Sequence, residues 1–264
     1  MGKRSSARRL NQPQSTRGSE TPLYAIDGGW HPDQNNPYTS QTRGPSTGRT
    51  DPNAREQRYL KTVKPRSANQ ARLMAALEEK TLVMALGPAG TGKTYLAVCK
   101  AVEALQAGSI ARIVLARPAV DAGEQIGFLP GGLEDKLAPF LRPLYDALSD
   151  RLSPKQLRSM LCEGVIEIAP IGFMRGRTLN NSFVVIDEAQ NCTYTQLKML
   201  LTRLGWNSTM AITGDPAQSD LLPGLSGLTD IAANIEPMED VEIVRMQGQD
   251  VVRHPLVAEM LDVL

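Results

Sequence analysis

The stretch that decides the fold covers residues 85–100 and reads ALGPAGTGKTYLAVCK. Residues 87–94 match the pattern GxxxxGK[ST], in which glycines let backbone N–H groups approach phosphate oxygens. A short apolar run, TLVMALG, precedes this loop, and a stretch with the apolar spacing of a helix follows it. The order strand, loop, helix directs the positive end of a helix at an anion. The stretch therefore predicts a phosphate-binding loop at the start of an α/β fold.

Several residues of this loop have an expected chemical role. Lys93 is expected to act in catalysis by reaching the β- and γ-phosphates, and the Thr94 hydroxyl is expected to ligate Mg²⁺. We therefore expect ATP and Mg²⁺ as cofactors. The expected nucleotide-binding residues here are Gly87, Pro88, Ala89, Gly90, Thr91, Gly92, Lys93, Thr94 and Tyr95.

A pair of carboxylates follows a second apolar run, in the stretch NSFVVIDEAQ. Residues 183–186 have the composition of a buried strand, which places Asp187 and Glu188 at its carboxyl end, where α/β sheets bind ligands. We expect Asp187 to hold Mg²⁺ and Glu188 to act as the general base for the attacking water. The stretch thus predicts the residues that hold the ion and activate the attacking water.

A third strand with a polar end is predicted in STMAITGDPAQSDL, where residues 210–213 precede Asp215 and Gln218. We expect Gln218 to act in catalysis, by hydrogen bonding to the γ-phosphate or to the attacking water. A glutamine in that position also distinguishes bound ATP from bound ADP. Three predicted strand ends therefore carry Lys, Asp-Glu and Gln in that order.

These three strand ends together resemble the helicase-like branch of RecA-type ATPases. Longer blocks across residues 67–264 are similar to the PhoH family in sequence and order. The blocks are GPAGTGKTYLAV, RIVLARPAVDAGEQIGFLPGGLEDKLAPFLRPLYDAL, MRGRTLN, VVIDEAQN, TGDPAQSDL and DVVRHPLV. The resemblance implies an ATP-hydrolysing domain related to superfamily 1 helicases and linked to RNA. In that light Gln70 resembles the glutamine that recognises adenine in helicases, with a plain surface glutamine as the alternative.

The alternation of predicted strands and helices favours a RecA-like P-loop NTPase core, an α/β fold with a mainly parallel sheet and helices on both faces. Pro139 and Pro143 are expected to break or kink the helix that contains them. The Gly- and Pro-rich segment 118–143 is expected to project near the nucleotide, either to contact nucleic acid or as an ordinary surface excursion. The strands are expected near Leu82, Arg112, Val165, Phe183, Thr209 and Val241.

Charge divides the chain into two expected units. Residues 1–66 carry 12 Lys+Arg and 5 Asp+Glu and are poor in large apolar residues, which predicts a disordered basic N-terminal tail. Residues 67–264 carry 17 and 23 of these residues, and form the expected ATPase domain. The tail is interpreted equally well as a nucleic-acid-binding arm or as a solvated linker. Three scattered cysteines, no secretory signal and no long apolar run favour a cytoplasmic protein without a membrane partner.

A single RecA-type domain leaves the γ-phosphate partly open. We therefore expect a homo-oligomer, a ring such as a hexamer, in which an arginine from a neighbouring copy completes the site in catalysis. Arg253 is the favoured arginine, and the rivals are Arg175, Arg177 and Arg203. The expected partner is single-stranded RNA or DNA. The alternative is a nucleotide-switched regulatory or assembly protein that binds a protein partner, and a small-molecule kinase is less favoured because an Arg-rich lid would be expected.

Overall fold

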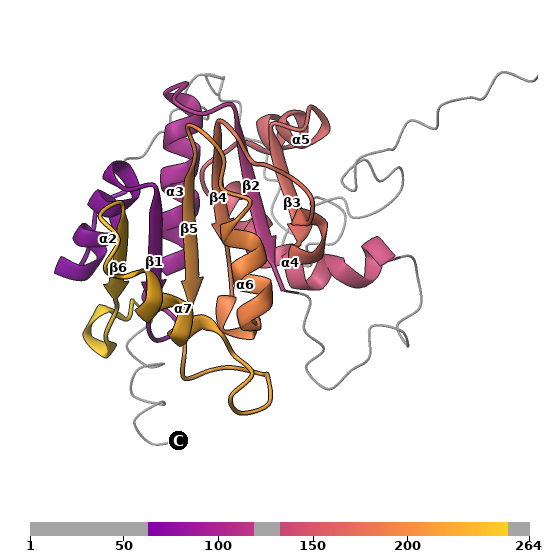
Figure 1. The fold of residues 1–264 in the computed structure, drawn as a ribbon. Helices are drawn as coiled ribbons and strands as arrows, with labels where there is room; N and C mark the ends of the chain where they lie inside the picture. The colour runs from indigo at the N-terminus through magenta and orange to yellow at the C-terminus, as the bar shows by residue number, and fades with distance from the viewer. Residues whose placement is uncertain (1–62, 119–132, 253–264) are drawn as a thin grey trace, which may run out of the picture.

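The protein contains a sheet of six parallel strands in the order β3-β2-β4-β5-β1-β6, as Figure 1 shows. The computed structural model describes residues 63–118 and 133–252. The predicted α/β fold with a parallel sheet is confirmed. The strands are β1 (Leu82–Leu86), β2 (Arg112–Arg117), β3 (Ile166–Pro170), β4 (Ser182–Ile186), β5 (Thr209–Gly214) and β6 (Val241–Arg245).

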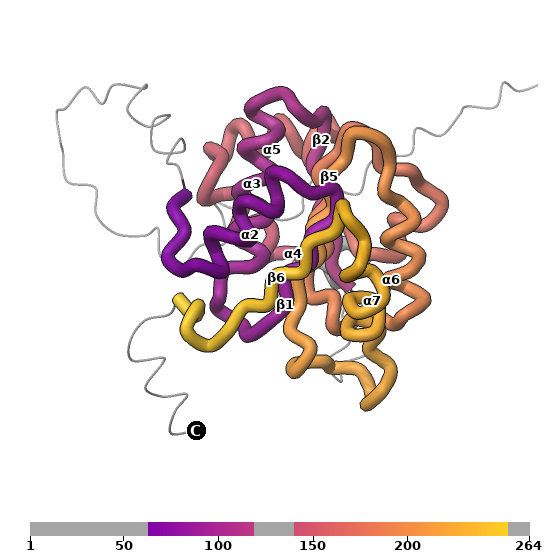
Figure 2. Tube along the Cα trace, turned by 60° about the vertical axis from the view of Figure 1, so that its left-hand side comes forward, coloured from indigo at the N-terminus to yellow at the C-terminus, as the bar shows by residue number. Residues whose placement is uncertain are grey.

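Helices cover both faces of the sheet (Figure 2). Helices α2 to α5 pack on one face, and α6 and α7 pack on the other. The α-helices are α2 (Ala68–Glu79), α3 (Lys93–Gln106), α4 (Leu133–Ser149), α5 (Pro154–Cys162), α6 (Tyr194–Leu201) and α7 (Leu228–Ile235). Short 3-10 helices are η3 (Ile171–Met174), η4 (Ala189–Asn191) and η5 (Gly248–Asp250). Within the two described ranges, no helix has the length and apolar character needed to cross a bilayer.

Alternate residues of the strands contribute to the two cores. Val83 and Ala85 of β1 pack with α2 to α5, whereas Met84 and Leu86 pack with α6 and α7. A strand covered on both faces must be apolar along its whole length, which explains why these strands are continuous apolar runs. The polar residues that follow the strands therefore stand out in the sequence.

Strand order brings the predicted functional segments to one edge of the sheet. Strand β5 lies between β1 and β4, with Leu86 opposite Gly214 and Ile186 opposite Ile212. All three strands run in the same direction, so their carboxyl ends meet. The phosphate loop, the carboxylate pair and the turn after β5 consequently share one edge.

Of the two expected effects of Pro139 and Pro143, the break is wrong, because α4 is continuous from Leu133 to Ser149, and the kink stays a prediction. Each proline removes one backbone hydrogen bond from the helix. Burial of the apolar residues at Leu144 and Leu148 offsets part of that loss, since both are fully enclosed. Most of segment 118–143 lies outside the described residues, and its expected role stays a prediction.

Candidate active site

The loop of residues 87–92 joins β1 to α3 and depends on glycine. Gly87, Gly90 and Gly92 have φ values of 137°, 82° and 84°, which side-chain-bearing residues rarely adopt. A Cβ atom on Gly87 would lie 2.3 Å from the carbonyl oxygen of Met246. The loop therefore packs against the end of β6 with no room for a side chain at Gly87, and it leads into the first turn of α3, where the helix end favours an anion.

Lys93 lies beneath this loop and is 9% exposed. Its Nζ donates hydrogen bonds to the carbonyl oxygens of Gly87, at 2.6 Å, and Pro88, at 2.8 Å. Burial lowers the pKa of Lys93, and the negative charges of Asp215, Glu188 and Asp187 oppose that shift. The ammonium group is thus held at the loop by backbone carbonyls, a position from which it can move onto a phosphate.

Thr94 and Asp187, the predicted Mg²⁺ ligands, are in direct contact. Thr94 Oγ1 donates to Asp187 Oδ1 at 2.6 Å, although the two residues are 93 positions apart. Thr213 Oγ1, at the end of β5, donates to the same carboxylate oxygen at 2.9 Å. Hydroxyl and carboxylate oxygens are the ligands that Mg²⁺ prefers, so this cluster fits the ion. The sequence analysis assigns no role to Thr213, because the sequence shows only that this residue ends a predicted strand.

Glu188 has a strained backbone at φ 53°, in the left-handed region. Such a conformation costs a non-glycine residue on the order of 1 kcal/mol and is found most often at functional sites. Its carboxylate Oε2 accepts a hydrogen bond of 2.5 Å from Gln190 Nε2. Gln190 Oε1 in turn accepts from the backbone N–H of Asp215 at 3.0 Å. Gln190, which the sequence analysis missed although it stands in DEAQ, thus joins Glu188 to the end of β5.

Arg117 is a second residue that the sequence analysis missed. It ends β2, with Nη1 3.5 Å from Asp187 Oδ2 and Nη2 3.5 Å from Glu188 Oε1. Its signal in the sequence is a charged residue directly after the apolar run IVLA. The carboxylates of Asp187 and Glu188 therefore face a guanidinium group of their own chain.

Gln70 lies against the phosphate loop and not on the surface. It is 5% exposed, its Nε2 donates to the carbonyl oxygen of Thr91 at 3.0 Å, and its Oε1 accepts from Arg66 N–H at 2.8 Å. The plain surface alternative is therefore wrong. Recognition of adenine by Gln70 stays a prediction.

Three expected site residues remain, namely Gln218, Tyr95 and Arg253. Gln218 is exposed in the turn after β5, and its backbone N–H donates to the carbonyl oxygen of Asp215 at 3.0 Å. Tyr95 is partly exposed, and its hydroxyl forms a hydrogen bond with Cys99. Arg253 lies outside the described residues. The roles expected for these three side chains stay predictions.

The three rival arginines differ in their contacts. Arg177 pairs with Glu167, and Arg203 Nη1 donates to the carbonyl oxygen of Arg177 at 2.9 Å. Arg175 is exposed after η3. Two of the three rivals are thus engaged within their own chain.

Comparison with known proteins gives a consistent family match. The family model described as "PhoH-like protein" matches residues 62–264. "PhoH-like protein" of Mycobacterium tuberculosis (strain H37Rv) is 52% identical over 203 residues, covering 76% of this chain and 58% of the relative. The Bacillus subtilis (strain 168) protein of the same name is 50% identical over 203 residues, covering 76% and 64%. "Protein PhoH" of Escherichia coli (strain K12) is 44% identical over 206 residues, covering 77% and 58%.

Two solved structures show a more distant similarity to this chain. The SWI2/SNF2 ATPase core of Sulfolobus solfataricus in complex with dsDNA has a TM-score of 0.43 and 16% identity, covering 74% of this chain and 51% of that one. The large terminase of a thermophilic bacteriophage has a TM-score of 0.47 and 10% identity, covering 75% and 50%. Both likenesses are too distant to bear on activity.

The contacts of Arg117 generate a prediction about Mg²⁺ in the absence of nucleotide. Arg117→Ala should tighten Mg²⁺ binding by about tenfold, because a unit charge and a divalent ion roughly 6 Å apart repel by ~1.4 kcal/mol even in bulk water. Titration calorimetry of the full chain measures this affinity. Arg112→Ala, at the other end of β2, is the matched control and should leave the affinity unchanged. An unaltered affinity in Arg117→Ala would show that the guanidinium does not compete for these carboxylates.

Proposed function

The chain belongs to the PhoH-like protein family, and from this premise we propose that it binds ATP with Mg²⁺ and hydrolyses the nucleotide where β1, β4 and β5 end. The observation that carries the proposal is the direct contact between Thr94 of the loop helix and Asp187 after β4. The chain spans 58–64% of the length of the three relatives compared above. The proposal therefore concerns the site of this chain alone.

Each residue of the site has a separate role in the proposed reaction. The amides of the loop and Lys93 Nζ bind the phosphates, and Thr94 and Asp187 would hold the ion that neutralises phosphate charge. Glu188 Oε1 or Oε2 orients the attacking water and accepts its proton. Gln190 fixes the carboxylate of Glu188 from one side, and Arg117 faces it from the other. Both contacts position the base before substrate arrives.

Two substitutions separate nucleotide binding from hydrolysis. Lys93→Ala should weaken ATP binding by about 10- to 100-fold, because a hydrogen bond to a charged group contributes ~1.5–3 kcal/mol. Glu188→Gln should keep ATP affinity but lose about 10²- to 10⁴-fold in turnover, because the amide cannot accept the proton. Calorimetry and phosphate release measure the two quantities. The exposed controls Lys155→Ala on α5 and Glu163→Gln directly after α5 should behave as the parent chain. Parent-rate hydrolysis by Glu188→Gln would exclude this residue as the general base.

We further propose that hydrolysis is coupled to work on single-stranded RNA or DNA. The support is the relation of the family to superfamily 1 helicases together with the basic charge of residues 1–66. Lys and Arg side chains that neutralise phosphates release counterions, so such binding weakens as salt rises. The proposal leaves the choice between RNA and DNA to experiment.

Single-stranded RNA or DNA should stimulate ATP turnover if this proposal holds. With about four phosphates held by the basic segment, deletion of residues 1–60 should flatten the plot of log affinity against log salt by roughly 3, at a slope near −0.7 per phosphate. Basal turnover is the control and should survive the deletion. ATP turnover that is unchanged by any nucleic acid would contradict coupling to RNA or DNA and would favour a nucleotide-switched protein.

The switch alternative has its own support in the turn after β5. Asn191 Nδ2 donates to Asp220 Oδ2 at 2.7 Å, and Asp220 N–H donates to Asn191 Oδ1 at 2.8 Å. The same turn exposes Leu222 and Leu225. Glu188 accepts from Gln190, and the adjacent Asn191 forms two hydrogen bonds with Asp220. A shift of Glu188 can therefore reach the turn that carries the two leucines. Such a surface suits a protein partner that responds to the bound nucleotide.

We also propose a head-to-tail homo-oligomer, a ring such as a hexamer, in which Arg253 of one copy completes the site of the next. Arg253→Ala should depress turnover on the order of 10³-fold with little change in ATP binding. Mixing Arg253→Ala with Lys93→Ala chains should restore part of the activity, because some interfaces then pair an intact loop with an intact arginine. Inactivity at every ratio, with mixed oligomers confirmed by native mass spectrometry, would contradict action between copies.

A further inference from the structure

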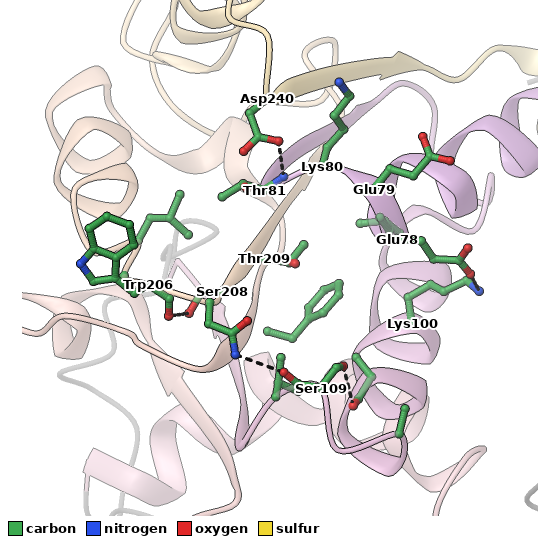
Figure 3. A pocket seen from close by; sticks show the side chains of 18 of the residues that line it. Glu78, Glu79, Lys80, Thr81, Lys100, Ser109, Trp206, Ser208, Thr209 and Asp240 are labelled. Carbon is green, nitrogen blue, oxygen red and sulfur yellow. Dashed lines mark hydrogen bonds and ion pairs between the residues drawn. The ribbon is translucent and has the colours of Figure 1, made fainter.

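A hollow of about 980 Å³ opens at the edge of the sheet opposite the nucleotide site (Figure 3). It lies where β1, β4, β5 and β6 begin, between the end of α2, the second half of α3 and the turn before β5. Leu77 and Phe183 give it an apolar floor that belongs to the core. None of the residues assigned above to nucleotide binding lines it.

Trp206 stands at the margin of this hollow with 89% of its surface exposed. Its backbone is held firmly, because Trp206 N–H donates to Asn180 Oδ1 at 2.8 Å and its carbonyl accepts from Asn181 N–H at 2.9 Å. The preceding Gly205 has no room for a Cβ, which would lie 2.2 Å from Asn180 Oδ1. The turn thus presents an indole on a fixed backbone, and tryptophan in such positions is typical of binding surfaces.

The charges around the hollow favour a cationic occupant. Lys100 pairs with Glu78 and with Glu103, and Glu103 also pairs with Arg151 at 3.3 Å. Lys80 Nζ donates to the carbonyl oxygen of Glu239 at 2.8 Å. Hydrogen bonds from Thr81 hold the pKa of Asp240 below its usual value, so this carboxylate is charged at neutral pH. The lining contains four carboxylates, Glu78, Glu79, Glu103 and Asp240, and two ammonium groups, Lys80 and Lys100.

An acidic hollow beside an exposed indole suits arginine in particular. The guanidinium group forms paired hydrogen bonds with carboxylates and stacks on aromatic rings, which an ammonium group does less well. Nucleic acid is a poor occupant, because its phosphates would meet the excess of carboxylates. The chemistry therefore points to an arginine-rich peptide.

We propose that the basic segment of the same chain, residues 1–62, docks in this hollow, with an arginine against Trp206. The segment carries eight Arg and two Lys against five Asp+Glu. The described chain begins at Val63, five residues before α2, and the end of α2 lines the hollow. A helix of 12 residues is about 18 Å long, a distance that roughly six extended residues span. Most of the segment is then free to occupy the hollow.

Covalent attachment strengthens this pairing. A tethered segment meets its site at an effective concentration on the order of millimolar, so weak charge pairs suffice to populate the docked state. Exposed charge pairs are screened by salt, since the Debye length falls from about 10 Å at 0.1 M to about 3 Å at 1 M. Docking should therefore be strong at low salt and lost at high salt.

Tryptophan fluorescence tests the proposal in the full chain. The chain has two tryptophans, so Trp30→Phe leaves Trp206 as the only reporter. Acrylamide should quench Trp206 weakly at low salt, and the quenching constant should rise by about twofold or more at ~1 M NaCl, where screening releases the segment. No nucleotide or nucleic acid is added, so the result does not depend on the proposed function.

Two further variants identify the two sides of the contact. Glu78→Gln with Glu79→Gln, on the rim, should give strong quenching at both salt concentrations, whereas the exposed Asp230→Asn on α7 should keep the salt response. Replacing Arg4, Arg8, Arg9 and Arg17 with Gln should weaken the salt response of Trp206 quenching, as the double change at Glu78 and Glu79 does.

Three results would overturn the proposal. The first is equal quenching of Trp206 at low and high salt in the Trp30→Phe chain. The second is a salt response that survives the Arg→Gln changes, because another occupant would then cover the indole. The third is protection that grows with protein concentration, which would assign the surface to a second copy of the chain.

Discussion

The hydrogen bond between Thr94 Oγ1 and Asp187 Oδ1 is the contact on which the site depends. It joins the first turn of the helix after the phosphate loop to the end of a strand that is not adjacent to β1. The gap between them is filled by β5, whose Thr213 hydroxyl reaches the same carboxylate. A large apolar side chain at position 213 would separate Thr94 from Asp187. The parallel arrangement of β1, β5 and β4 thus matters because it sets the distance between two oxygens.

The carboxylate of Glu188 is held from two sides, by Arg117 at the end of β2 and by Gln190 in η4. Arg117 reaches it from β2, and Gln190 ties it to the backbone of Asp215 after β5. Its left-handed backbone conformation turns the residue out of the path of β4, at a modest cost in conformational energy. The same chain of contacts continues into the turn that exposes Leu222 and Leu225. Glu188 and that exposed turn are therefore connected through covalent neighbours and short hydrogen bonds.

Local chemistry explains what the sequence could predict. The phosphate loop needs its glycines within a few residues, and polar residues after buried strands are visible against apolar runs. The loop after β1 and the Asp187–Glu188 pair after β4 therefore lie at the strand ends that the sequence indicates, while their roles stay predictions. Thr213, Gln190 and Arg117 acquire their positions from the strand order, which no short stretch of sequence contains. The sequence predicts no uninterrupted helix across Pro139 and Pro143, because it does not show the burial of apolar side chains that keeps α4 continuous. The burial of Gln70 likewise depends on how α2 packs against the loop.

The central claim is that Lys93, Thr94 and Asp187 form a nucleotide site whose groups are bound to one another before the nucleotide arrives. A crystal structure of the full chain with Mg²⁺ and a non-hydrolysable ATP analogue tests this most directly. We predict that Lys93 Nζ leaves the carbonyl oxygens of Gly87 and Pro88 for phosphate oxygens, and that Thr94 and Asp187 turn from each other to the ion. A nucleotide bound elsewhere, or bound while Lys93 keeps both carbonyl contacts, would contradict it.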